Sequence, residues 1–126
     1  MQYQSILLID DDIEDQEIFT LALSKVSDTL NCTAFTSAKD ALTQLDARNV
    51  NPDVIFLDLN MPIMTGEEFL KEIKAIDHLK NIPVIIFSTS SNASTILTTK
   101  ELGANAFITK PNRFDLLVEL LKPIIN

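Results

Sequence analysis

Three continuously apolar segments lie along the chain, and each ends at a polar residue. They are Ile6-Leu7-Leu8-Ile9 before Asp10, Val54-Ile55-Phe56-Leu57 before Asp58, and Val84-Ile85-Ile86-Phe87 before Ser88. Because apolar and polar residues do not alternate in them, these segments predict strands that are buried on both faces, as in a parallel sheet covered by helices. Two weaker apolar runs, residues 32–35 and 106–108, predict edge strands.

Apolar residues at helical spacing predict one helix after each strand. The predicted buried faces are Ile18, Leu21, Ala22 and Val26; Ala38, Ala41, Leu42 and Leu45; Phe69, Leu70, Ile73 and Ile76; Ala93, Ile96 and Leu97; and Phe114, Leu117, Val118 and Leu121. Thr65 and Glu68 have the spacing of a capping box, Ser37 and Asp40 resemble one, and Gly103 is placed to end the fourth helix. Five repeats of strand and helix predict an open parallel α/β sheet with helices on both faces.

The length and composition fit one globular domain. The 126 residues are 46% apolar and 22% charged, which are ordinary proportions, and a chain of this length supports one sizeable core. The pattern shows no repeat and no linker. We therefore expect residues 1–126 to form a single domain with no output domain attached.

The charge balance narrows the class of partner. Ten basic and 18 acidic residues give a net charge of −8, and the pI is about 4.4. Such a chain is unsuited to nucleic acids or anionic membranes, so we expect neither as a partner. The lone Cys32, a start without the basic head of a signal peptide, and apolar runs far shorter than a membrane span favour a cytoplasmic location.

Polar residues gather where the predicted strands end. With strand order 2-1-3-4-5, Asp10, Asp11 and Asp58 converge on one cleft beyond the carboxyl ends of the strands, with Ser88 and Lys110 to one side. Because several carboxylates in one cleft repel each other, a divalent cation would relieve the conflict. All-oxygen ligands suit Mg²⁺, or Mn²⁺ as an alternative. A metal beside a lysine and a hydroxyl is typical of a phosphoryl-binding site.

The ordered combination of these motifs resembles the receiver domain of two-component response regulators, including stand-alone chemotaxis-type members, from about Ser5 to Ile124. The resemblance rests on four segments. These are the strand before Asp10-Asp11, the stretch from Pro52 to Gly66 with Asp58 and Met61-Pro62, the stretch from Pro83 to Ser88, and the stretch from Gly103 to Pro111. The resemblance implies a flavodoxin-like, doubly wound, five-stranded parallel sheet with five helices.

The resemblance also implies a role for each site residue. Asp58 would accept a phosphoryl group. Asp11 would bind Mg²⁺ directly, Asp10 mainly through water, and the backbone carbonyl of Asn60 would add another oxygen. The hydroxyl of Ser88 would contact the phosphoryl group. Lys110 would pair with Asp58 and then with the phosphoryl group, and the Lys110–Pro111 peptide bond would be cis. Phe107 and Ser88 would act as switch residues that change the surface of the fourth helix, fifth strand and fifth helix.

The implied function is a phosphorylation switch and not a turnover enzyme. A sensor histidine kinase or a histidine phosphotransfer protein would donate the phosphoryl group, and an unidentified downstream protein would bind the switched surface. The domain would catalyse its own phosphorylation and dephosphorylation.

Two other interpretations remain open at this point. One is a metal-dependent phosphohydrolase with an aspartate nucleophile, since Asp12 lies two residues after Asp10; the chain is too short for the cap that such enzymes use. The other is a flavin-binding module of similar topology, which the acid cluster disfavours because it repels a phosphate.

Overall fold

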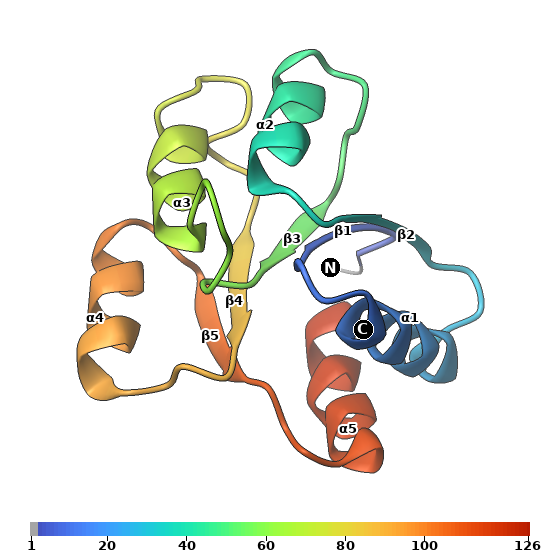
Figure 1. Cartoon of the computed structure of the whole chain (residues 1–126). Helices are drawn as coiled ribbons and strands as arrows, with labels where there is room; N and C mark the ends of the chain where they lie inside the picture. The colour runs from blue at the N-terminus through green and yellow to red at the C-terminus, as the bar shows by residue number, and fades with distance from the viewer. Residues whose placement is uncertain (1–2) are drawn as a thin grey trace.

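Five parallel strands form one sheet in the computed structural model, which describes residues 3–126 (Figure 1). The strands are β1 (Ser5–Ile9), β2 (Asn31–Phe35), β3 (Val54–Leu57), β4 (Val84–Ser88) and β5 (Ala106–Thr109). Their spatial order is β2-β1-β3-β4-β5, and every neighbouring pair is parallel. The predicted strand order and α/β class are confirmed.

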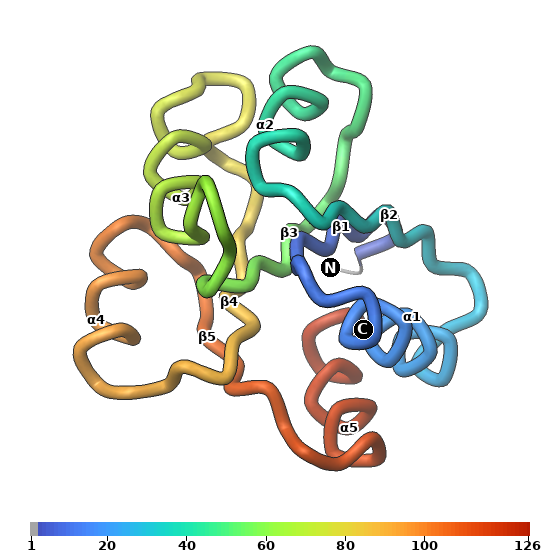
Figure 2. Tube along the Cα trace, viewed as in Figure 1, coloured from blue at the N-terminus to red at the C-terminus, as the bar shows by residue number. Residues whose placement is uncertain are grey.

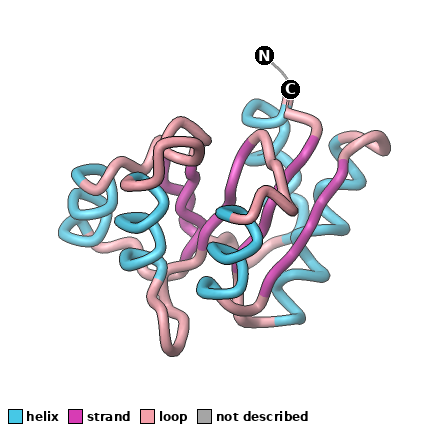
Figure 3. Tube along the Cα trace, turned by 90° about the horizontal axis from the view of Figure 1, so that it is seen from above, coloured by secondary structure: helices cyan, strands magenta, loops and turns pink. Residues whose placement is uncertain are grey.

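Five helices within the described residues connect and follow the strands. They are α1 (Ile13–Val26), α2 (Ala38–Asp46), α3 (Gly66–Lys74), α4 (Ala93–Glu101) and α5 (Phe114–Ile125). The chain trace shows α1 and α5 on one face of the sheet and α2, α3 and α4 on the other (Figure 2). The view from above shows helices on both sides of the strands (Figure 3). None of the helices in the described part of the chain is long and apolar enough to cross a membrane.

The central strands divide their side chains between two cores, because successive residues of a strand point to opposite faces. Leu7 and Ile55 pack toward α2 and α3, whereas Leu8 and Phe56 pack toward α1 and α5. These four side chains are fully buried. A continuously apolar strand is therefore required here, which is why the three strongest runs of the sequence became β1, β3 and β4.

The buried face of α1 differs from the predicted one. Phe19, Ala22 and Leu23 are buried, whereas Ile18 and Leu21 are 47% and 54% exposed. Two overlapping sets of residues have helical spacing in this segment, and the set that contains the aromatic residue buries more apolar surface. The Phe19 ring lies 5.0 Å from the Phe56 ring and 5.4 Å from the Phe87 ring, measured between centroids.

The buried face of α4 also differs from the prediction. Thr99 is the one buried residue of this helix, which lies wholly within the described residues. Ile96 and Leu97 are 39% and 57% exposed. The hydroxyl of Thr99 donates to the carbonyls of Thr95 and Ile96 at 3.1 Å each, so its polar atom is satisfied within the helix. This helix therefore rests on the edge of the sheet with little apolar contact.

The predicted helix ends are confirmed. The Thr65 hydroxyl accepts from the Glu68 backbone and the Glu68 side chain accepts from the Thr65 backbone, which is a complete capping box at the start of α3. The Ser37 side chain accepts from the Asp40 backbone at the start of α2. Gly103 follows the end of α4 with a φ of 106°, a backbone conformation that residues other than glycine disfavour.

Candidate functional site

The carboxyl ends of β1 and β3 place two acidic residues next to each other. The strand register pairs Ile9 with Leu57, so the residues that follow, Asp10 and Asp58, leave the sheet together. The backbone N–H of Asp58 donates to the Ile9 carbonyl at 2.9 Å. Because helices cover both faces of these central strands, Asp10 is fully buried and Asp58 is 6% exposed.

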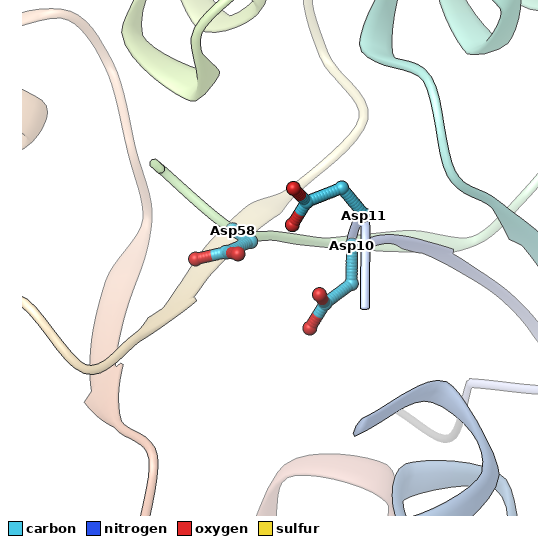
Figure 4. A group of neighbouring side chains, drawn as sticks. All are labelled: Asp10, Asp11 and Asp58. Carbon is cyan, nitrogen blue, oxygen red and sulfur yellow. The ribbon is translucent and has the colours of Figure 1, made fainter. Parts of the chain in front are cut away.

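Asp11 completes a cluster of three carboxylates. One carboxylate oxygen from each of Asp10, Asp11 and Asp58 lies within 4.8 Å of the other two. The three side chains come from the ends of two strands and border one shared space (Figure 4). Asp11 is exposed, so the cluster is open to solvent on its side. The structure thus brings together the three acidic residues that the sequence predicted to meet, at a spacing that can hold a metal ion.

Lys110 extends its ammonium group into this cluster from the end of β5. Its Nζ lies 2.7 Å from Asp10 Oδ2 and 3.7 Å from Asp58 Oδ2. The backbone N–H of Lys110 donates to the Ser88 carbonyl at 2.9 Å, which fixes where the side chain begins. The side chain is 11% exposed. Asp10 is thus the closer partner of Lys110, whereas the family resemblance implied Asp58.

Two residues in the first turn of α1 contact members of the site, and neither contact was predicted. Asp15 Oδ2 lies 3.0 Å from Lys110 Nζ. The side-chain amide of Gln16 donates to the Asp10 carbonyl at 2.8 Å. Asp12 is the N-cap residue of α1, and its side chain accepts from the Asp15 backbone at 3.2 Å.

Burial and charge oppose each other in the cleft. Burial raises the pKa of Asp10 and of Asp58 above the ordinary aspartate value of 3.8, although the charge of Lys110 acts in the opposite direction. Burial by itself lowers the pKa of Lys110, but hydrogen bonds to Asp10 and Asp15 outweigh it and the pKa is raised above 10.5. The cleft therefore holds two carboxylates whose negative charge is made costly by burial, next to one protonated ammonium. Additional positive charge would relieve this imbalance.

The loops after β3 and β4 meet at the mouth of the cleft. Ser88 ends β4 and is fully buried, and its hydroxyl accepts from the Ser90 backbone at 3.2 Å. The side-chain amide of Asn60 donates to the Ser90 hydroxyl at 2.8 Å and so bridges the two loops. The roles of the Asn60 carbonyl in metal binding and of Ser88 in phosphoryl binding stay predictions.

The glycine of the β3–α3 segment is required by the packing behind Asp58. A Cβ atom on Gly66 would lie 2.3 Å from the Asp58 carbonyl oxygen and 2.7 Å from the Leu59 Cα, closer than real Cβ atoms approach backbone. The Gly66 backbone N–H donates to the Leu59 carbonyl at 3.1 Å. Helix α3 therefore begins in direct contact with the backbone that carries Asp58.

Phe107 lies apart from the acidic cleft, between β5 and α4. Its half-buried side chain helps to line a pocket of about 250 Å³ together with Ile96, Thr99 and Ala104. The predicted switch aromatic therefore sits beside the helix with the least apolar burial. Its movement on phosphorylation stays a prediction.

The expected cis bond between Lys110 and Pro111 is wrong. Among residues 3–126 no peptide bond is cis. The trans form is the lower-energy form of a bond to proline, by about 0.5–1 kcal/mol. With this trans bond the backbone of Lys110 reaches Ser88 and its side chain reaches Asp10.

The sequence is similar to those of known proteins. Residues 6–122 match the family model described as the response regulator receiver domain. Two-component response regulator ORR1 from Oryza sativa subsp. japonica is 37% identical over 112 residues, which are 84% of this chain and 48% of that protein. The chain thus spans about half the length of this curated relative.

Solved structures give the same result at higher coverage. The phosphorylated cyanobacterial phytochrome response regulator RcpA superposes with a TM-score of 0.88 at 32% identity, over 97% of this chain and 91% of that chain. The Mn²⁺-bound form of response regulator Rcp1 superposes with a TM-score of 0.85 at 29% identity, over 96% and 91% of the two chains.

Proposed function

This chain belongs to the response regulator receiver domains, and we propose that it is a phosphorylation switch whose acceptor is Asp58. The carrying observation is the cluster of Asp10, Asp11 and Asp58 within 4.8 Å, with the Lys110 ammonium inserted from β5. The similar RcpA structure is of a phosphorylated protein, which supports the same chemistry here. In a switch of this kind the donor is a phosphohistidine on a sensor histidine kinase or a phosphotransfer protein.

The transfer step uses a carboxylate oxygen of Asp58, whose side chain is 9% exposed. A carboxylate oxygen of Asp58 attacks the phosphorus of the phosphohistidine, so that a P–O bond forms and the P–N bond breaks. The electron pair of the broken bond stays on the imidazole nitrogen, which takes a proton from solvent. Lys110 stabilises the negative charge of the phosphoryl oxygens. Hydrolysis later reverses the state when water attacks the same phosphorus and inorganic phosphate leaves Asp58.

The residues present fit a divalent cation. The cluster offers only oxygen ligands, from carboxylates whose burial makes uncompensated charge costly, and such donors suit Mg²⁺ or Mn²⁺. The similar Rcp1 structure is described as Mn²⁺-bound, which supports this choice. Asp10, Asp11, Asp58 and the Asn60 carbonyl would hold the ion, which would supply positive charge to the phosphoryl oxygens when bound.

The output is binding of a downstream protein at a surface that phosphorylation changes. Ser88 and Phe107 would act as switch residues, and α4, β5 and α5 would form the surface. The weak apolar burial of α4 supports this assignment, because a helix held by few contacts moves at low energetic cost. The net charge of −8 disfavours nucleic acid and anionic membranes as partners. We place the protein in the cytoplasm, where its donors would phosphorylate it.

The phosphohydrolase alternative has less support. Its second acid would be Asp12, but the Asp12 side chain caps α1 by accepting from Asp15. The cluster instead uses Asp11, which directly follows Asp10.

The test is phosphorylation by acetyl phosphate with Mg²⁺, followed by intact-mass measurement. We expect one phosphoryl group per wild-type chain, loss of labelling in Asp58→Asn, and loss when EDTA replaces Mg²⁺. Asp28→Asn is the matched control, since it removes an exposed carboxylate outside the cluster and should label normally. Undiminished labelling of Asp58→Asn would remove Asp58 from its role. Rapid sustained release of phosphate from simple phosphate esters would instead support the hydrolase.

A further inference from the structure

Lys110 has a partner that the phosphorylation chemistry described above does not use. Within residues 3–126, the carboxylates that reach its Nζ are those of Asp10 at 2.7 Å, Asp15 at 3.0 Å and Asp58 at 3.7 Å. The first two accept hydrogen bonds from the ammonium, while Asp58 lies beyond hydrogen-bond distance. The ammonium is therefore hydrogen-bonded to the α1 helix through Asp15.

We propose that Asp15 is a positioning residue that competes with phosphorylated Asp58 for the Lys110 ammonium, and that it thereby weakens the phosphorylated arrangement. This inference rests on the proposed function, because it concerns the same Lys110 and the same acceptor. It adds a fourth carboxylate, from α1, to the three of the candidate metal cluster.

The competition follows from the number of donors and acceptors. An ammonium has three N–H donors, and two of them are directed to Asp10 and Asp15 before any phosphoryl group arrives. A metal held by Asp10, Asp11 and Asp58 would neutralise Asp10 and weaken its hold on Lys110. Asp15 lies outside that cluster, so its charge stays available to retain the ammonium while the phosphoryl oxygens attract it.

The surroundings make this contact stronger than an ordinary surface ion pair. The Lys110 side chain is 11% exposed and the Asp15 side chain 38% exposed. Lys110 Nζ lies 5.5 Å from the centroid of the Phe87 ring, which excludes water on that side. The lining of a cavity of about 70 Å³ includes Asp15, Lys110 and Phe87, so there is free space beside the contact between Asp15 and the ammonium.

The chain offers a matched control in the same helical turn. Glu14 is exposed and is not among the carboxylates that reach Lys110 in the described residues. Glu14→Gln therefore removes the same charge from the same end of α1 and changes its interaction with the helix dipole in the same way. Any difference between Asp15→Asn and Glu14→Gln reports the contact with Lys110.

The test measures the affinity of the full chain for trifluoroberyllate, an anion that mimics a phosphoryl group on a carboxylate, at saturating Mg²⁺. We expect Asp15→Asn to bind it roughly threefold to tenfold more tightly than wild type, and Glu14→Gln to remain within about twofold. Asp15→Ala, which also removes the acceptor oxygen, should bind at least as tightly as Asp15→Asn. Equal affinities in Asp15→Asn and Glu14→Gln, or weaker binding in Asp15→Asn, would overturn the proposal.

A second measurement separates positioning from a merely structural role. The ¹⁵N resonance of the Lys110 ammonium in the unphosphorylated protein should shift in Asp15→Asn and stay unchanged in Glu14→Gln. An unchanged resonance in both variants would overturn the proposal even if the variants differed in stability. If wild type itself fails to bind trifluoroberyllate, the proposed function fails; if wild type binds and Asp15→Asn matches it, only the role of Asp15 fails.

Discussion

Helices α1 and α4 cover opposite faces of the sheet and are held there in different ways. The α1 helix buries Phe19, Ala22 and Leu23, and the Phe19 ring packs against two aromatic rings from the sheet. Across the described residues of α4, burial is confined to Thr99, while Ile96 and Leu97 stay exposed. One helix is fixed by apolar packing, and the other rests on an edge strand that is itself partly exposed.

This difference assigns different tasks to the two regions. The acidic cleft lies on the tightly packed part of the molecule, between the ends of β1 and β3 and the first turn of α1. Such packing holds carboxylates in place against their mutual repulsion. The proposed switch residue Phe107 lies beside α4, the helix with little apolar burial. Under the proposed function, phosphorylation in the well-packed region would be expressed as movement of the weakly packed helix.

The largest effect should come from removing the aromatic side chain that anchors α1. We expect Phe19→Ala to lower the free energy of unfolding by about 3–5 kcal/mol, since it deletes a fully buried ring. Leu97→Ala is the matched truncation on α4, and because Leu97 is 57% exposed it should cost less than about 1 kcal/mol. Urea denaturation of the two variants measures both. A comparable loss in the two variants would refute the contrast between the helices.

A smaller effect of opposite sign should come from the cleft itself. Without divalent cations, Asp58→Asn should raise the free energy of unfolding near neutral pH, by less than Phe19→Ala lowers it. The reason is that burial raises the pKa of Asp58 above 3.8, so the folded wild type binds the proton more tightly than the unfolded chain does. Protonated Asp58 therefore contributes fully to the free energy of unfolding of the wild type below pH 3.8, and this contribution is lost as the pH rises through the pKa of Asp58 in the folded protein.

The pH dependence tests that explanation. The difference between Asp58→Asn and wild type should vanish toward acidic pH and grow toward neutrality, as followed by denaturation at a series of pH values. Millimolar Mg²⁺ should reduce the difference by stabilising the wild type alone. A difference that does not change with pH would rule out the charge of Asp58 as its cause.

The smallest effect concerns the backbone just beyond Asp58. Ile63 has a φ of 70°, a conformation that β-branched residues disfavour, and its side chain is 93% exposed. We expect Ile63→Gly to stabilise the fold by about 0.5–1 kcal/mol, which raises the melting temperature by a few degrees. Ile63→Ala should fall between glycine and wild type. A lower melting temperature in Ile63→Gly would show that the conformation carries no strain.

The strands and the acid cluster were predictable because they depend on strong local patterns. The uninterrupted apolar runs ending at Asp10 and Asp58 predicted central parallel strands, and adjacent parallel strands bring their carboxyl ends to one edge. The convergence of the acids then follows from topology alone. The capping box at Thr65 and the glycine after α4 were equally local and equally predictable.

The buried faces of α1 and α4 and the contact between Asp15 and Lys110 depend on contacts between distant parts of the chain, which a local sequence pattern does not reveal. In α1, two residue sets had helical spacing, and only packing against Phe56 and Phe87 selected the one with Phe19. The pairing of Asp15 with Lys110 joins residues 95 positions apart, so no local motif marks it. In α4 the apolar residues remained exposed because β5 offers an edge and not a covered core.

The backbone position of the proposed acceptor Asp58 depends on the absence of a side chain at Gly66, an uncharged residue. Because a single added carbon would collide with the carbonyl of Asp58, any larger residue there must push α3 away or displace the acceptor backbone. The close packing between the backbone at the acceptor and the start of α3 therefore requires glycine at position 66. Substitutions at position 66 should therefore impair phosphorylation of Asp58 while every acidic side chain of the cluster is still present.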